Sequence, residues 1–365
     1  MTTPRQTPLQ GVHERLRAAM TSFAGWQMPL RYTSETAEHQ AVRNAAGLFD
    51  LSHMGEITVA GADAGALLDY ALVSNLSALR PGRARYTMIC ADDGGVLDDL
   101  VVYRLDEDRF LVIANASNTG VVFGALADRA GAYDAQVSDA TEDWALVAIQ
   151  GPAAERILGP LASDLDLAAM KYYAGAFGSV AGRRAWVART GYTGEDGFEV
   201  FCRPEDAVPV WDLLAAAGGP AGLVPAGLAA RDTLRLEAGM PLYGNELGPD
   251  VTPFEAGLGR VVKFDKPGEF VGREALAARA ASGPVRRLAG LTIRSRRIAR
   301  HGYPVLADGK ECGVVTSGAP SPTLGVPIAM AFLEPAVDDH VLTVGIRGEA
   351  VPAQLTDLPF YRRRH

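Results

Sequence analysis

The stretch Gly94-Gly95-Val96-Leu97-Asp98-Asp99 opens a β-strand that we predict to run over residues 96–105. A second predicted strand, residues 86–90, precedes it, and the Asp and Gly residues at 92–95 are typical of a hairpin turn with positive φ. Because side chains alternate along a strand, Asp98 and Asp99 are expected on opposite faces. At least one carboxylate is then poorly solvated, which is costly unless it is paired. The alternative is that both acids finish the turn and face water.

The composition is that of a globular enzyme. The 365 residues are 48% hydrophobic and 21% charged, which suits two or three domains with a sizeable core. The net charge of -8 disfavours binding to nucleic acid or to an anionic membrane. Residues 1–10 contain no apolar signal core, and no long apolar run suggests a membrane span. The three cysteines have no metal-ligand spacing, so we expect buried thiols in a cytoplasmic protein.

Strands and helices mix without strict βαβ alternation, which predicts an α+β fold. Helices are expected over residues 13–20, 36–46, 62–70, 118–130, 206–217 and 227–237, with an aromatic turn at 23–29. Near residue 283 the pattern changes to short β runs broken by Gly, Pro and Asp. This pattern predicts a small all-β domain at the C-terminus, either a barrel or a sandwich.

A glycine-rich loop forms the second candidate site. In Arg189-Thr190-Gly191-Tyr192-Thr193-Gly194-Glu195-Asp196-Gly197-Phe198-Glu199, three glycines let the backbone approach a flat ligand, and Tyr192 offers a ring for stacking. Glu199 points opposite to Phe198 on the following strand and is suited to a bidentate pair of N–H donors. The alternative is an ordinary turn with solvated acids.

The helix predicted over residues 227–237 carries Arg231 and Arg235 on one face, four residues apart. The alternative is a surface helix on which Asp232 and Glu237 are the local partners. The histidines lack metal-ligand spacing, and His53 is interpreted as structural. Because neither the histidines nor the cysteines have metal-ligand spacing, no metal is expected. Dinucleotide, phosphate-loop and serine-nucleophile motifs are also missing from the sequence.

Taken together, these segments resemble the T-protein family of the glycine cleavage system. The resemblance rests on motifs that occur in order over nearly the whole chain: FAGWQMP (23–29), GLFDLSHMG (47–55), GGVLDDL (94–100), RTGYTGEDGFE (189–199), RDTLRLEAGMPLYG (231–244) and SPTL (321–324). The chain departs from the family at Gly325-Val326, where a basic or polar pair is common, and at Leu51, where Val is usual.

The resemblance implies two interleaved mixed α/β domains and a C-terminal all-β barrel around a central folate-binding hole. Residues 1–280 would form the folate-binding aminomethyltransferase region. Its two interleaved subdomains would comprise residues 1–49 with 141–280, and residues 50–140. Residues 285–365 would form the barrel domain.

The activity implied is that of a tetrahydrofolate-dependent aminomethyltransferase in glycine degradation. It would take the methylene of the aminomethyl group on the dihydrolipoyl arm of H-protein and form 5,10-methylenetetrahydrofolate and ammonia. The resemblance makes Asp99, and not Asp98, the catalytic carboxylate. Glu199 would pair with the 2-amino and N3 edge of the pterin. The remaining folate-binding residues would be Met54, Tyr86, Asn115, Tyr192, Arg231 and, at the folate carboxylates, Arg362.

Related activities stay open at this point. The same fold serves tetrahydrofolate-dependent demethylases and the C-terminal half of sarcosine and dimethylglycine dehydrogenases, whose N-terminal flavin domain has no counterpart in this sequence. A non-catalytic folate-binding factor for iron–sulfur assembly is disfavoured because its Lys-Gly-Cys signature is replaced by GMPLYG at 239–244. From the residues alone, a sugar- or nucleotide-binding α+β enzyme also remains open.

Overall fold

The computed structural model describes residues 3–337 and 341–363. The chain forms two compact units, each made of segments that are far apart in sequence. Unit 1 comprises Met1–Leu68, Asn75–Tyr86 and Leu100–Asp232. Unit 2 comprises Asp69–Ser74, Thr87–Asp99 and Thr233–His365.

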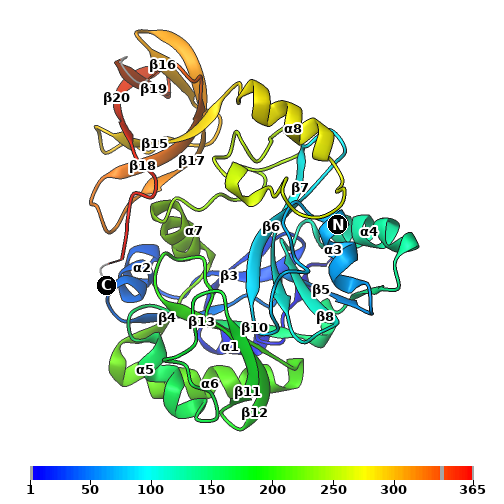
Figure 1. Ribbon diagram of the computed structural model, residues 1–365. Helices are drawn as coiled ribbons and strands as arrows, with labels where there is room; N and C mark the ends of the chain where they lie inside the picture. Colours follow the sequence, from blue (N-terminus) through cyan, green and yellow to red (C-terminus); the bar gives the residue numbers. More distant parts are fainter. Residues whose placement is uncertain (1–2, 338–340, 364–365) are drawn as a thin grey trace. The chain divides into compact units, whose positions relative to one another are not determined.

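Unit 1 contains a six-stranded sheet. Its strand order is β11 (Gly175–Val180), β12 (Arg183–Ala188), β13 (Gly197–Cys202), β10 (Ala145–Gln150), β4 (Ala46–Asp50) and β14 (Leu223–Pro225). Phe198 and Val200 of β13 point to the face where α5 (Ala154–Leu158) and α6 (Ala207–Gly218) pack, and they share a buried core with Trp211 of α6 (Figure 1). Glu199 alternates with them and therefore points to the opposite face.

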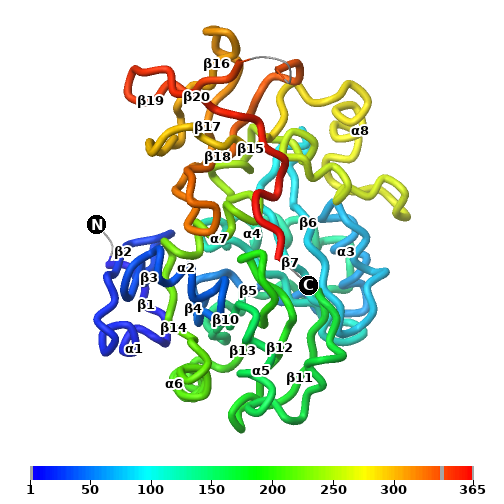
Figure 2. The backbone as a smooth tube through the Cα atoms, turned by 90° about the vertical axis from the view of Figure 1, so that its left-hand side faces the viewer, coloured from blue at the N-terminus to red at the C-terminus, as the bar shows by residue number. Residues whose placement is uncertain are grey.

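The N-terminal segment corrects two predictions. Helix α1 (Gln10–Arg15) is followed closely by Arg17, whose φ of 54° is left-handed. Strand β2 (Ala19–Phe23) then begins where a helix over 13–20 was expected. The predicted aromatic turn is a hairpin, because Ala24 and Gly25 both have positive φ and pair Phe23 with Trp26 at the start of β3 (Trp26–Arg31). Strand β1 (Arg5–Gln6) extends this sheet, and α2 (Glu35–Asn44) follows (Figure 2).

The hairpin around Asp98 and Asp99 belongs to a second sheet. Its order is β6 (Ala84–Cys90), β7 (Val96–Arg104), β8 (Arg109–Ala114), β5 (Gly55–Ala60) and β9 (Gln136–Asp139). Gly94 has a φ of 87° in the turn, as predicted. Asp98 is 0% exposed whereas Asp99 is partly buried, so the two acids do point to opposite faces. The interpretation in which both face water is wrong for Asp98. Helices α3 (Ala64–Ala71) and α4 (Thr119–Arg129) connect these strands.

The C-terminal part of unit 2 is a closed antiparallel barrel. Its order is β15 (Arg287–Ile293), β18 (Pro327–Leu333), β17 (Lys310–Pro320), β16 (Pro304–Ala307), β19 (Leu342–Ile346) and β20 (Glu349–Thr356), drawn in yellow to red in Figure 2. Leu291, Val305 and Val315 are among its buried residues. The predicted α+β class with a C-terminal β-barrel is confirmed. Strands β16 and β20 were not anticipated, and α8 (Arg273–Ser282) precedes the barrel.

Short 3-10 turns and the cysteines complete the description. The turns are η1 (Ala130–Ala132), η2 (Thr141–Asp143), η3 (Gly159–Leu161), η4 (Pro204–Asp206), η5 (Gly219–Ala221) and η6 (Gly259–Val261). Cys90, Cys202 and Cys312 are buried thiols, as predicted. In the described part of the chain, no helix combines the length and apolar character that a membrane crossing requires.

Helix α7 (Leu228–Glu237) ends at the predicted residue, and Gly239 follows it with a φ of 65°. Arg235 is only 1% exposed, and its guanidinium donates to Glu246 at 3.0 Å and to Ser317 of β17 at 2.8 Å. The carboxylate of Glu237 accepts from the backbone N–H of Thr323 at 3.0 Å. The alternative of a surface helix is therefore wrong for Arg235 and Glu237.

We expect Arg235→Met to lower the free energy of unfolding by about 3–5 kcal/mol, because it leaves the buried charge of Glu246 without its partner. Urea unfolding monitored by circular dichroism measures this loss. The double variant Arg235→Met/Glu246→Gln should recover most of it, since the new amide would keep an acceptor for the Leu242 N–H but carry no charge. A double variant as unstable as the single one would contradict this account.

Candidate active site

Glu199 lies on the face of the unit 1 sheet that points away from α5 and α6, and it is flanked by two small residues. In the register of the sheet it stands opposite Ala148 of β10 on one side and Ala188 of β12 on the other. Directly opposite residues share a face and lie close together. Both alanines are fully buried, whereas Glu199 is partly buried.

One carboxylate oxygen of Glu199 is held by two hydroxyl groups. Thr190 donates to Oε2 at 2.5 Å and Tyr103 donates to the same atom at 3.0 Å. Burial, and next the charge of Glu199, raise the pKa of Tyr103 well above its usual value. The phenol therefore keeps its proton and acts as a donor. These contacts fix the orientation of the carboxylate.

A buried arginine anchors the glycine-rich loop. Arg43 of α2 donates to the carbonyl of Thr193 at 2.7 Å and to Glu195 at 2.9 Å, and both charged side chains are almost fully buried. The interpretation of this loop as a turn with solvated acids is therefore wrong for Glu195. Arg189 also pairs with Asp196 at 2.5 Å.

Gln150 explains two of the loop glycines. Its side chain donates to the carbonyl of Thr190 at 3.0 Å and accepts from the hydroxyl of Thr193 at 3.0 Å. A Cβ on Gly191 would lie 1.9 Å from the Gln150 amide oxygen, and one on Gly197 would lie 2.6 Å from its nitrogen. A side chain at either position would therefore displace Gln150 from its hydrogen bonds with the loop.

Tyr192 and Arg231, two of the predicted folate residues, lie in contact. The guanidinium carbon of Arg231 lies 4.6 Å from the centre of the Tyr192 ring, within cation–π range. Both side chains are partly buried. This pair presents an aromatic ring and a positive charge on the same unit as Glu199.

His53 is a buried residue next to Met54. It is 2% exposed, and its Nδ1 atom has no hydrogen-bond partner among residues 3–337 and 341–363. Burial, and next the positive charge of Arg231, lower the pKa of His53 to about 4. The imidazole is therefore neutral near pH 7, and protonating it would place a second positive charge near Arg231.

This depressed pKa makes stability depend on pH. Below about pH 6.5 the unfolded state binds a proton that the folded His53 does not, until the pH reaches about 4. The free energy of unfolding should therefore fall by up to about 3 kcal/mol as the pH drops through this window. We expect His53→Gln to lose less stability between pH 7 and pH 4 in urea titrations. His301→Gln, at an exposed histidine, should keep the wild-type pH profile; a wild-type profile in His53→Gln would refute the assignment.

The other predicted folate residues of unit 1 occupy strand ends and loops. Met54 lies in the turn between β4 and β5, Tyr86 lies on β6, and Asn115 directly follows β8. All three are partly buried. Asn115 accepts a hydrogen bond from the backbone N–H of Asn118 at 2.8 Å through its carbonyl, which turns the chain into α4.

Unit 2 contains Asp99 and Arg362. The start of β7 packs tightly on the loop after Tyr243, because a Cβ on Gly95 would lie 2.0 Å from the carbonyl oxygen of Pro249. Burial, and next the charges of Asp98 and Asp99, raise the pKa of Tyr243. Tyr243 therefore lies in the field of both acids. Arg362 is exposed.

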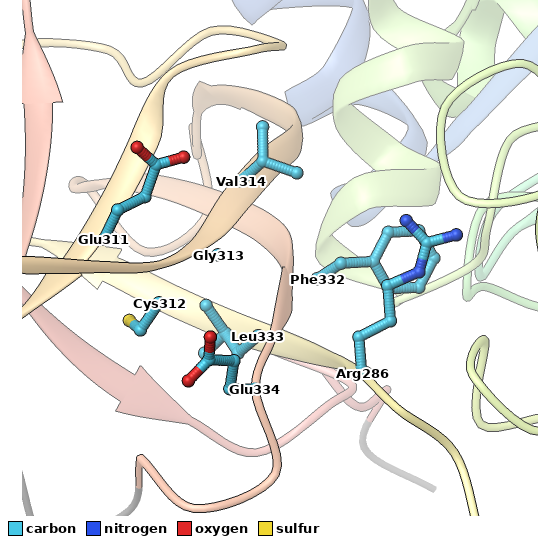
Figure 3. Close-up of a pocket in the computed structure, with 8 residues that line it drawn as sticks. All are labelled: Arg286, Glu311, Cys312, Gly313, Val314, Phe332, Leu333 and Glu334. Carbon is cyan, nitrogen blue, oxygen red and sulfur yellow. The ribbon is translucent and has the colours of Figure 1, made fainter.

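A cavity of about 370 Å³ on the barrel is lined by residues of β17 and β18. Its lining includes Glu311, Val314 and Glu334, and Figure 3 shows the Arg286 guanidinium over the Phe332 ring, 4.6 Å from its centre. Arg286 is already paired with Glu255 at 2.9 Å. The predicted site residues do not line this cavity, so it gives no support to the predicted chemistry.

Tyr103, Arg43 and Gln150 were not among the site residues predicted from the sequence. Tyr103 had one signal, a polar group in an apolar strand. Its partnership with Glu199 depends on the packing of two sheets. No cluster of possible metal ligands occurs in the described part of the chain.

Comparison with known proteins assigns both parts of the chain to one family. Residues 9–266 match the family model described as the GCVT N-terminal domain, and residues 286–362 match the glycine cleavage T-protein C-terminal barrel domain. The chain is 61% identical to an aminomethyltransferase of Saccharopolyspora erythraea, over 100% of both chains. It is 59% identical to one of Streptomyces coelicolor, over 99% of this chain and 98% of the relative.

A solved structure agrees with this similarity. The crystal structure of glycine cleavage system aminomethyltransferase T from Bartonella henselae superposes with a TM-score of 0.92. The two chains are 35% identical, and the match covers 99% of each.

Proposed function

The chain belongs to the glycine cleavage T-protein family of aminomethyltransferases, and we propose that its acceptor is tetrahydrofolate and its donor the aminomethylated dihydrolipoyl arm of H-protein. The reaction moves the methylene group from sulfur to N5 and N10 of the folate. The products are 5,10-methylenetetrahydrofolate, ammonia and the dihydrolipoyl thiol.

The surroundings of Glu199 carry this proposal. Two hydroxyl groups hold its Oε2 atom, and its neighbours across the sheet are the small residues Ala148 and Ala188. The 2-amino and N3 edge of a pterin is a pair of N–H donors on a flat ring, which suits a fixed carboxylate bordered by methyl groups. Tyr192, backed by Arg231, offers an aromatic surface for the ring. The residues present therefore fit a pterin.

The remaining recognition residues follow the family motifs. We assign Met54, Tyr86 and Asn115 to contacts with the folate ring system. Arg362 would meet the folate carboxylates, for which an exposed guanidinium is suited.

Asp99 is the catalytic group in this proposal. When N5 attacks the methylene carbon, this nitrogen gains positive charge. A fixed carboxylate stabilises the charge and can accept the proton from N5. Asp99 is partly exposed, whereas Asp98 is fully buried.

The proposed reaction balances in atoms and protons. The C–S and C–N bonds of the aminomethyl group break, and two new C–N bonds form to the folate. The folate gives up its N5 and N10 hydrogens as protons. One proton is taken by the thiolate and one by the leaving amine.

The cytoplasmic location remains a prediction from the sequence.

We expect Asp99→Asn to reduce turnover by at least two orders of magnitude, because the amide neither stabilises the cation nor accepts its proton. The measurement is ammonia release from aminomethylated H-protein with tetrahydrofolate. The same assay, run with a panel of methyl donors, distinguishes this reaction from that of a tetrahydrofolate-dependent demethylase.

Asp98→Asn is the matched control for this experiment. Because Asp98 is buried, the substitution should act on the melting temperature more than on turnover per folded molecule. Equal, near-wild-type turnover in both variants would rule out the role of Asp99.

We expect Glu199→Gln to weaken tetrahydrofolate binding by about 1–3 kcal/mol, because a hydrogen bond to a charged acceptor is lost. Isothermal titration calorimetry measures the effect. Glu205→Gln, at an exposed position after β13, serves as the control and should bind like the wild type. Unchanged affinity in Glu199→Gln would argue against pterin recognition by this residue.

A further inference from the structure

The hydrogen bonds to Glu199 are one-sided. Among the described residues, the donors to this side chain, Thr190 and Tyr103, both reach Oε2. The carboxylate can accept further bonds through Oε1, and a charged acceptor gains most from donors in fixed directions. The protein thus uses one oxygen of Glu199 to orient the other.

Tyr103 reaches Glu199 from a different sheet. It lies on β7 with a fully buried side chain, whereas Glu199 lies on β13, 96 residues further along the chain. The centre of the Tyr103 ring lies 5.6 Å from that of Phe201 and 6.3 Å from that of Trp186, both in edge-on contact. Phe201 and Trp186 are paired across β13 and β12, two positions along from the pair Glu199 and Ala188. Rings on the same sheet face hold the phenol at a fixed height over the carboxylate.

The hydroxyl groups form a closed triangle with the carboxylate. The Tyr103 and Thr190 oxygens lie 2.7 Å apart, and each contacts Oε2. Two hydroxyl protons serve these three contacts. Both protons are used best when each hydroxyl donates to an ionised Glu199, since a carboxylate has no proton of its own to give.

We propose that Tyr103 and Thr190 are positioning residues for folate recognition, which hold Glu199 so that Oε1 faces the N–H edge of the pterin. This inference rests on the proposed function. It adds that affinity for the pterin depends on two hydroxyls that need not touch the ligand.

The test is a double-mutant cycle on folate affinity. Tyr103→Phe keeps the ring and removes the donor. We expect calorimetry to show a dissociation constant for tetrahydrofolate that is roughly five- to thirtyfold larger. In the Glu199→Gln background the same substitution should change affinity by less than about twofold, because the interaction it serves is already lost. The KM for tetrahydrofolate should rise while kcat and the KM for aminomethylated H-protein stay within about twofold.

Tyr32→Phe is the matched control. It removes the hydroxyl of a partly buried tyrosine, which contacts His13 at 2.9 Å and not Glu199. Folate affinity should stay unchanged. Thr190→Val removes the second hydroxyl with little change in shape, and it gives an independent measurement should Tyr103→Phe fold poorly. It should lower folate affinity in the same way.

The outcomes separate the two proposals. Wild-type protein that does not bind tetrahydrofolate would refute the proposed function. Wild-type binding with unchanged affinity in Tyr103→Phe and Thr190→Val would refute the positioning role alone. Equal losses in the wild-type and Glu199→Gln backgrounds would also refute it, since the hydroxyls would then act through packing.

Discussion

Two hydroxyl groups hold the Glu199 carboxylate, and these contacts connect three separate parts of unit 1. Burial removes water from a carboxylate, and this loss costs free energy unless hydrogen-bond donors of the protein replace the water. Thr190 supplies one from the start of the glycine-rich loop, and Tyr103 supplies the other from the neighbouring sheet. The loop, the sheet face that carries Glu199 and the second sheet therefore meet at a single oxygen atom.

Buried ion pairs extend this constraint to the surrounding loops. Arg43 and Glu195 fix the glycine-rich loop, and Arg235 and Glu246 fix the segment after α7 within unit 2. Such pairs add little net stability compared with apolar packing, but they penalise every arrangement that separates the charges. These two ion pairs therefore favour the one conformation of each loop in which the charges stay in contact.

Local patterns predicted most of the elements, with limits that have physical causes. Strand β6 and helix α7 were predicted to end at Cys90 and Glu237, where they do end, because apolar periodicity is a local signal. The N-terminal hairpin was missed because Ala24 and Arg17 adopt positive φ, which is uncommon for residues other than glycine. Strands β16 and β20 were missed; the pairing of β16 with β17 shifts register between Val305 and Leu306, which interrupts the alternation that the sequence would show. The predicted boundaries of the interleaved domains remain a proposal.

The alternation of a β-strand was enough to place Asp98 and Asp99 on opposite faces, since side-chain direction depends only on the local backbone. Family motifs supplied the candidate residues, but not their partners. Only the tertiary structure decided that Asp98 is the buried acid and that Glu199 is held by Tyr103, 96 positions away. Contacts between distant segments leave no period in the sequence, because they are set by how sheets pack and not by the order of neighbouring residues.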